Sequence, residues 1–215
     1  MKTSAVILAA GLSSRMGDFK PLMKLKEKTV IENLIDSVLD AEIDEIIIVL
    51  GFRGKDLENH IKSNYKYDLA LNKITFVYNK NYKKTDMLTS IKIGIRNLSY
   101  CDGFYIIPVD MPAIKKDTFI TLKNSMIKTK SEVVFATLNG YKKHPPLIDN
   151  NFKDIILNYE GEGGLREIWK VYNLNIKYVP VNDYGCAIDI DTKRDYEALV
   201  KYINNRDNLI VDKIG

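Results

Sequence analysis

Apolar runs of strand length alternate with helical patterns through the first half of the chain. Strands are expected at 5–10, 45–50, 74–78 and 104–108, and helices between them at 29–40, 56–64 and 87–98. The run at 45–50 is apolar at nearly every position, as in a strand covered by helices on both faces. This alternation predicts an α/β domain of Rossmann-like type, with a mostly parallel mixed sheet flanked by helices.

The regular alternation of strand and helix patterns ends in the second half of the chain. A helix is expected at 118–127 and a strand at 132–138, followed by the hairpin dipeptide Asn139-Gly140, which predicts an antiparallel excursion. Helices are expected at 152–158 and 165–171, a strand at 175–181, and a last helix from Thr192, with Asp195 as its capping-box partner. We expect a single domain over 1–204 and a C-terminal tail over 205–215.

Composition narrows the class of protein. The 215 residues are 46% hydrophobic, a proportion typical of one globular domain. The net charge is +4, and the basic residues are spread along the chain rather than gathered in a block of Lys and Arg. We therefore expect neither nucleic acid nor a membrane as a partner. The apolar run at 5–10 is too short for a secretory signal or a membrane span, and two cysteines, Cys101 and Cys186, suit a reducing compartment. A cytoplasmic protein is expected.

The loop after the first strand carries candidate chemistry. Ala9, Ala10 and Gly11 are small enough for a ligand to approach the backbone, whose N–H groups can form an anion-binding nest, and Arg15 and Lys20 add two cations. The loop lacks the Gly-x-Gly-x-x-Gly motif of dinucleotide binding and the Gly-Lys-Ser/Thr of a P-loop. A solvated Gly/Ser turn is the structural alternative.

Carboxylates occur where an open α/β sheet binds ligands. Asp110 directly follows an apolar strand, at the carboxyl end of the expected sheet. A helix N-cap or an Asx turn before Pro112 is the structural alternative for Asp110. Asp189 and Asp191 lie one strand step apart on one face, and Asp191 could instead cap the last helix.

The residues at 8–20, Leu-Ala-Ala-Gly-x-Ser-x-Arg-Met-Gly-x-x-Lys, resemble the signature of the MobA/MocA-like nucleotidyltransferases. The resemblance continues across nearly the whole chain. It includes Pro-Val-Asp-Met-Pro at 108–112, His-Pro-Pro-Leu at 144–147, Gly-Glu-Gly-Gly-Leu-Arg at 161–166 and Asp-Ile-Asp-Thr at 189–192. It implies the fold of the nucleotide-diphospho-sugar transferases.

The resemblance also implies a reaction and a set of site residues. An NMP would pass from an NTP to a small phosphorylated acceptor, with pyrophosphate release and Mg²⁺ as cofactor. The implied catalytic residues are Arg15, Lys20 and Asp110, and the implied metal ligands are Asp110 and Asp189, with Asp191 as the alternative second ligand. Nucleotide contacts are implied for Leu8, Ala9, Ala10, Gly11, Leu12, Ser13, Met87 and Ser90. Acceptor contacts are implied for His144, Pro145, Gly163, Gly164 and Arg166.

Two departures from the family pattern affect the choice of substrates. Asp86 replaces a glycine on the nucleotide side, and Lys143 replaces the glycine before His144. We expect His144, on a loop stiffened by the prolines after it, to contact the acceptor rather than to act as a base, because a phosphate acceptor is already anionic. A satisfied structural histidine is the alternative.

CTP:molybdopterin cytidylyl transfer is the leading activity, because Leu-Ala-Ala-Gly is more similar to the cytidylyl group than the Leu-Ala-Gly-Gly of guanylyl enzymes. Sugar phosphates and phosphocholine are alternative acceptors. Two other classes stay open: a GT-A-type glycosyltransferase, which normally shows Asp-x-Asp, and a non-catalytic nucleotide-binding regulator.

Overall fold

Strand β1 (Thr3–Ala9) lies inside the sheet, with all seven of its residues buried. It pairs in parallel with β4 (Glu45–Leu50) on one side and with β6 (Gly103–Pro108) on the other. All six residues of β4 are buried too, as expected for a strand covered on both faces. The computed structural model describes residues 1–12 and 17–211, with side chains up to residue 205.

The main sheet has seven strands in the order β5-β4-β1-β6-β8-β7-β9. Its remaining strands are β5 (Ile74–Tyr78), β7 (Val133–Leu138), β8 (Tyr141–Asp149) and β9 (Ile176–Pro180). β8 is antiparallel to both of its neighbours, and the other pairs in the sheet are parallel. The expected α/β fold with a mostly parallel sheet is therefore confirmed.

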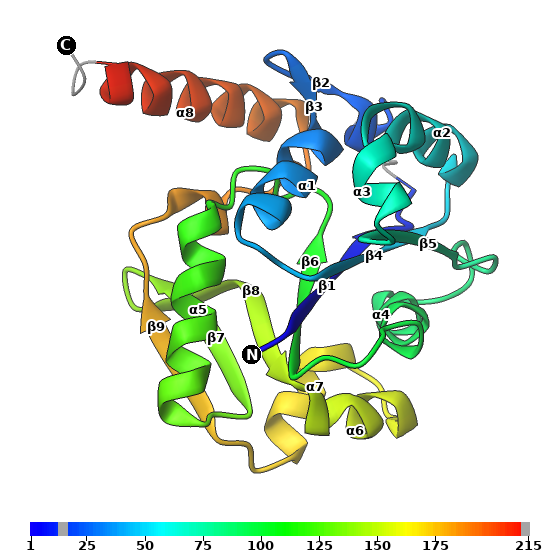
Figure 1. Cartoon of the computed structure of the whole chain (residues 1–215), viewed down its shortest axis with the longest axis vertical. Coiled ribbons are helices and arrows are strands. Elements are labelled where there is room, and N and C mark those ends of the chain that lie inside the picture. The colour runs from blue at the N-terminus through cyan, green and yellow to red at the C-terminus, as the bar shows by residue number, and fades with distance from the viewer. Residues whose placement is uncertain (13–16, 212–215) are drawn as a thin grey trace.

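Helices cover both faces of this sheet (Figure 1). One face packs against α1 (Val30–Asp40), α2 (Gly54–Asn64) and α5 (Lys116–Thr129). The other packs against α4 (Met87–Arg96), α6 (Lys153–Asn158) and α7 (Gly164–Val171). Because side chains alternate along a strand, Ile7 of β1 belongs to the first layer and Val6 to the second.

Shorter elements complete the chain. They are a two-stranded ribbon of β2 (Lys24–Leu25) and β3 (Lys28–Thr29), the short helix α3 (Lys66–Ala70), and the 3₁₀ turns η1 (Lys20–Leu22), η2 (Asn150–Phe152) and η3 (Tyr184–Ala187).

The last helix, α8 (Lys193–Val211), packs on the N-terminal ribbon. Its buried contacts form what we call the C-terminal cluster: Leu25, Val30, Ala113, Ile190, Leu199 and Ile203. The expected boundary after residue 204 falls within this helix.

Local signals placed several elements correctly. Thr29 and Glu32 form the expected capping box of α1: Thr29 N donates to Glu32 Oε2 at 2.6 Å, and Glu32 N donates to Thr29 Oγ1 at 3.4 Å. Asn139 and Gly140 both have positive φ, 52° and 80°, as the hairpin between β7 and β8 requires.

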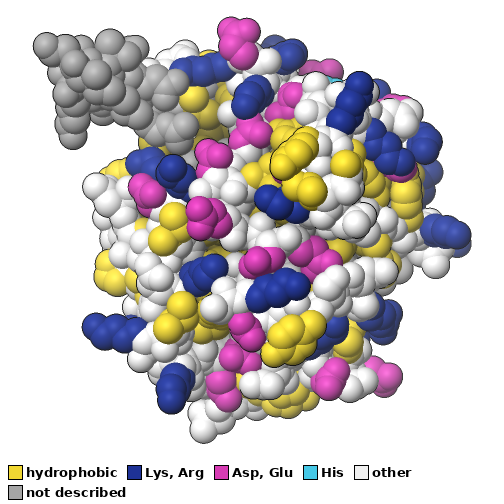
Figure 2. All heavy atoms as spheres, in the orientation of Figure 1, with side chains coloured by type: hydrophobic (Ala, Val, Ile, Leu, Met, Phe, Trp, Pro, Cys, Tyr) yellow, Lys and Arg dark blue, Asp and Glu magenta, His cyan; other side chains and the backbone are white. Residues whose placement is uncertain are grey.

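The surface carries charges of both signs. Basic and acidic side chains are interspersed over the face seen in Figure 2. Among the described helices, none combines the length and the apolar content that a bilayer crossing needs.

The chain reverses direction across the sheet between β1 and β6. From β1 it proceeds outward through β4 to β5, then returns through α4 to β6 on the other side of β1. Loops leaving β1 and β6 therefore separate at their carboxyl ends. Open α/β sheets bind ligands at such a point.

The helix α4 approaches the sheet closely at Gly94, and a substitution there can test this packing. A Cβ on Gly94 would lie 2.3 Å from Val6 Cγ1 and 3.0 Å from Val49 Cγ2. We expect Gly94→Ala to lower the free energy of unfolding by about 1–3 kcal/mol through overpacking, even though alanine favours a helix interior by about 1 kcal/mol. Urea unfolding checks this, with Gly11→Ala as control because a Cβ there meets nothing within 4 Å. Unchanged stability of Gly94→Ala would contradict the tight helix–sheet contact.

Candidate active site

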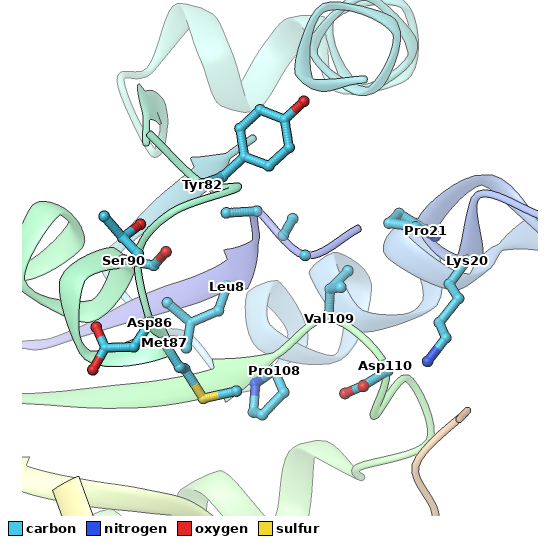
Figure 3. Close-up of a pocket in the computed structure, with 14 residues that line it drawn as sticks. Leu8, Lys20, Pro21, Tyr82, Asp86, Met87, Ser90, Pro108, Val109 and Asp110 are labelled. Atoms are coloured by element: carbon cyan, nitrogen blue, oxygen red, sulfur yellow. The ribbon is translucent and has the colours of Figure 1, made fainter. Parts of the chain in front are cut away.

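A pocket of about 300 Å³ opens at the carboxyl ends of β1 and β6. Its walls come from the loops after these two strands, from η1 and from the start of α4. The described lining residues are Leu8, Ala9, Ala10, Gly11, Lys20, Pro21, Tyr82, Thr85, Asp86, Met87, Ser90, Pro108, Val109 and Asp110. Figure 3 shows Lys20 and Asp110 at one end and Asp86, Met87 and Ser90 toward the other.

The β1 loop gives the pocket an open backbone. Ala10 is buried against Gly51, where a Cβ would lie 2.5 Å from Ala10 O, whereas a Cβ on Gly11 would meet nothing within 4 Å. A ligand can therefore approach the chain closely at Gly11. Leu12, expected to contact the nucleotide, is 44% exposed and does not line the pocket. Ser13 and Arg15 lie outside the described residues.

Lys20 places a buried cation in the pocket. Its residue is 8% exposed, and its Nζ lies 3.0 Å from Asp191 Oδ1. In Figure 3 its ammonium and the Asp110 carboxylate point toward one another. Sequence reasoning left Asp191 as a metal ligand or a helix cap and missed this ion pair. The cap is Thr192, whose Oγ1 accepts from Asp195 N at 3.3 Å.

Asp110 is held beside two further carboxylates. It is half-buried in the turn after β6, and α5 begins only at Lys116, so Asp110 is not a helix cap. Ile190 N donates to Asp110 O at 3.0 Å, which brings Asp189 and Asp191 to this turn. Burial raises the pKa of Asp110; the Lys20 ammonium opposes this rise, and the Asp189 and Asp191 carboxylates add to it.

This donor set suits a hard divalent cation. Carboxylates brought together at a partly buried place repel one another, and a cation between them would relieve that repulsion. Among the residues whose side chains the structure describes, no group of three or more His, Cys, Asp or Glu could by itself hold a metal ion. In proteins Mg²⁺ usually takes one or two carboxylates and completes its shell with substrate phosphates and water.

The start of α4 forms the far wall. Met87 and Ser90 line the pocket there, as expected. Asp86, the departure from the family glycine, is the N-cap of α4 and accepts from Thr89 N at 2.9 Å. Its carboxylate therefore has a structural role at the pocket edge.

Sequence reasoning missed the residue that organises this wall. Asn79 is buried, and its Nδ2 donates to Thr85 Oγ1 at 2.9 Å and to Ser90 Oγ at 3.0 Å. Asn79 directly follows β5, at the same edge of the sheet as the other site residues. This position was the only feature of the sequence that could have identified it as a site residue.

The expected acceptor residues lie outside this pocket. His144 and Pro145 belong to β8, so the prediction of a proline-stiffened loop was wrong. The register with β7 shifts between Phe135 and Ala136, and His144 and Pro145 bulge out of the ladder there. Proline has no N–H to donate to a ladder, which favours a bulge at this place.

His144 nevertheless lies close enough to Asp189 to be influenced by its charge. The residue is exposed, but surrounding protein atoms desolvate its imidazole ring. This desolvation and the nearby Lys142 ammonium lower the pKa of His144, and the Asp189 carboxylate opposes the shift. Asp189 thus acts electrostatically on both Asp110 and His144.

The remaining acceptor candidates lie at the N-terminus of α7. Gly163 is its N-cap with φ 86°, Gly164 begins the helix, and Arg166 is exposed in the first turn. Burial lowers the pKa of Lys142, and the Arg166 guanidinium lowers it further, so two cations lie near one another there.

Residues 5–177 match the sequence pattern of the MobA-like NTP transferase domain. The chain belongs to this family. As a MobA-like NTP transferase it is a nucleotidyltransferase, and the resemblance identified from its motifs is confirmed.

Two relatives that align over nearly their whole length are named for different nucleotides. A probable molybdenum cofactor guanylyltransferase of Natranaerobius thermophilus is 31% identical over 212 residues, 93% of this chain and 96% of that protein. The molybdenum cofactor cytidylyltransferase of Escherichia coli strain K12 is 24% identical over 192 residues, 89% of this chain and 92% of that protein.

Solved structures share the fold. A nucleotidyl transferase from Methanothermobacter thermautotroptrophicus superposes with a TM-score of 0.77 at 21% identity, covering 95% of this chain and 99% of that one. A Mycobacterium tuberculosis protein solved in complex with manganese superposes with a TM-score of 0.67 at 17% identity, covering 93% and 98%.

The open backbone at Gly11 gives a direct test of the pocket. We expect Gly11→Val to weaken NTP binding by roughly tenfold or more, because the branched side chain occupies space that the phosphates need. Its thermal unfolding should match the wild type, since a Cβ there meets no protein atom. Calorimetric titration with NTP measures the effect, with the exposed Ala70→Val as a matched control. Wild-type affinity in Gly11→Val would remove this loop from the nucleotide site.

Proposed function

We propose that the protein moves an NMP from an NTP to a small phosphorylated acceptor of the molybdopterin type, releasing pyrophosphate with Mg²⁺ as cofactor. The observation that carries this proposal is the meeting of an open backbone loop, a buried cation and a carboxylate in one pocket: Gly11, Lys20 and Asp110. The names of the relatives support molybdopterin as the acceptor.

The reaction is an in-line displacement at phosphorus. An oxygen of the acceptor phosphate attacks the α-phosphorus of the NTP, a P–O bond forms, and the bond to the β-phosphate breaks as pyrophosphate leaves. The attacking phosphate is already anionic at neutral pH, so no general base is needed. Catalysis then consists of positioning and of neutralising charge.

Three groups of the chain perform these tasks. The backbone around Gly11 receives the triphosphate, and Arg15 and Lys20 neutralise charge that builds on the leaving pyrophosphate. Asp110 and Asp189 are the carboxylates that would hold Mg²⁺. When bound, this ion supplies Lewis-acid stabilisation of the reacting phosphate.

The acceptor enters from the β8 side. The lowered pKa of His144 leaves its imidazole neutral at pH 7, which favours hydrogen bonding to the acceptor over charge neutralisation. Arg166 supplies an anion contact from the first turn of α7, with Pro145, Gly163 and Gly164 shaping the same side.

CTP is the proposed nucleotide. The Ala-Gly pair at 10–11 is more similar to the cytidylyl group, while the two relatives described above are named for different nucleotides. Asp86 at the pocket edge adds a carboxylate on the nucleotide side.

Pyrophosphate release tests the proposal. Purified protein with Mg²⁺ is incubated with each of four NTPs and with molybdopterin, sugar 1-phosphates or phosphocholine. We expect release that requires molybdopterin and is fastest with CTP. Faster release with GTP would overturn the base assignment, and release only with a sugar phosphate or phosphocholine would overturn the acceptor. NTP binding without release under every condition would indicate a regulator, and NDP release from an NDP-sugar would indicate a glycosyltransferase.

Lys20→Ala should impair turnover more than binding. A cation on the departing pyrophosphate contributes most as charge builds there, so we expect kcat to fall by roughly a hundredfold or more. The dissociation constant for NTP should rise far less. Steady-state kinetics and equilibrium titration separate the two, with exposed Lys128→Ala as control. A rise in KM at unchanged kcat would mean that Lys20 only binds the ground state.

Asp110→Asn keeps the shape of the side chain but removes its charge. We expect turnover to fall on the order of a thousandfold, equivalent to several kcal/mol of lost metal-based stabilisation, and Asp189→Asn to show a smaller loss. Turnover over a Mg²⁺ titration, with thermal melts, measures both, and exposed Asp154→Asn is the charge-matched control. Normal turnover of Asp110→Asn at limiting Mg²⁺ would place the metal on other carboxylates.

A further inference from the structure

The loop after β4 supports the pocket from behind. Phe52 of this loop is partly buried, and its backbone N–H donates to Ala10 O at 3.5 Å. The two loops approach closely, because a Cβ on the neighbouring Gly51 would lie 2.5 Å from the same carbonyl oxygen. The β4 loop therefore lies directly on the β1 loop, whose residues Ala10 and Gly11 line the pocket.

The Phe52 side chain contacts two further segments. Its ring meets the Phe19 ring edge-on, with the ring centroids 5.8 Å apart and the ring planes at 78°. It also meets the Tyr82 ring, with centroids 6.4 Å apart and planes at 50°. Neither phenylalanine lines the pocket, but Tyr82 does, and so does Lys20, which directly follows Phe19. Figure 3 shows Tyr82 and Lys20 on different sides of the pocket, so one ring connects both sides.

Phe19 has a second contact with the β4 loop. It is buried, and the Arg53 guanidinium lies over its ring, with Cζ 5.0 Å from the centroid. Arg53 Nε donates to Asp56 Oδ2 at 2.8 Å, which orients the guanidinium. Arg53 has a φ of 48°, a conformation that residues with a Cβ rarely adopt. The β4 loop therefore holds Phe19 through two adjacent side chains, Phe52 and Arg53.

The segment that carries Tyr82 is connected to β4 through its backbone. Asn79 N donates to Leu50 O at 2.8 Å, and Tyr82 N donates to Asn79 O at 3.3 Å. These hydrogen bonds fix where the segment begins. The contact with Phe52 fixes where the Tyr82 side chain lies.

We infer that Phe52 is a positioning residue, whose ring holds the turn with Lys20 and the wall with Tyr82 in place relative to the β1 loop. The inference rests on the proposed binding of an NTP in this pocket. An aromatic side chain is rigid, and an edge-on ring pair has a preferred geometry, so it restricts two segments more than an aliphatic contact does. Binding and catalytic groups need such support, because a site that is slightly loose loses much of its effect.

Two other roles for Phe52 predict different results. A ring that only fills the core would lower thermal stability when it is replaced, and the folded protein would keep its nucleotide affinity. A ring that stacks directly on the base would leave the affinity for inorganic triphosphate unchanged, because that ligand has no base.

Phe52→Leu removes the ring but keeps an apolar side chain. We expect it to raise the dissociation constants for CTP and for inorganic triphosphate by about threefold to tenfold and to lower kcat by about tenfold, because small misplacements of binding and catalytic groups have effects of this order. Phe52→Tyr, which keeps the ring, should bind both ligands as the wild type does. Calorimetric titration measures binding, and pyrophosphate release measures turnover.

Phe119→Leu is the matched control. Phe119 forms a similar edge-on pair with Tyr105 in the core, with centroids 5.2 Å apart and planes at 88°. Its replacement should lower thermal stability and leave both dissociation constants unchanged. A double-mutant cycle of Phe52→Leu with Phe19→Leu tests whether the ring acts through Phe19. In the Phe19→Leu background, Phe52→Leu should cause a much smaller further loss of affinity.

The outcomes separate this inference from the proposed function. Wild-type affinity in Phe52→Leu, a loss for CTP without one for inorganic triphosphate, an equal loss in Phe52→Tyr or Phe119→Leu, or additive losses in the cycle would each overturn the positioning role. Absence of pyrophosphate release from the wild type with every acceptor would overturn the proposed function instead. The dissociation constants need no acceptor, so they decide the role of Phe52 in that case too.

Discussion

The parallel pairing of β1 with β6 is the constraint on which the rest of the site depends. The two strands run side by side with Leu8 opposite Pro108, so both chains leave the sheet at the same edge. The first continues into the small residues up to Gly11, and the second into Asp110. Because helices cover both faces of the sheet, this edge is where polar chemistry can reach solvent.

The charged side chains at this edge of the sheet are partly buried, and charges of opposite sign lie beside one another. Burial and the carboxylates of Asp189 and Asp191 raise the pKa of Asp110, and the Lys20 ammonium opposes them. Lys20 in turn is buried beside Asp191, which compensates for its lost hydration. A triphosphate and a divalent cation would enter a site already balanced between cation and anions, which is the preorganisation that phosphoryl transfer needs.

The proposed acceptor side has a different structural origin. It lies where the sheet departs from parallel order, at the bulge of β8 and the N-terminus of α7. Asp189 connects this region with the pocket, because its carboxylate influences the pKa of both Asp110 and His144. The proposed nucleotide half of the site therefore comes from the parallel sheet, and the proposed acceptor half from the antiparallel excursion.

Much of the fold and several residues that line the candidate pocket could be predicted from the sequence, because those features depend on neighbours along the chain. Periodicity gave the strands and helices, Thr29 with Glu32 gave a helix start, Asn139-Gly140 gave a hairpin, and the motif at 8–20 indicated the family. Tertiary structure decided the rest. The Lys20–Asp191 pair, the Asn79 network and the bulge at His144 each require segments that meet only when the sheet and α8 are packed. No local pattern encodes such meetings, because they depend on which strands become neighbours and on how buried charges and proline are accommodated there.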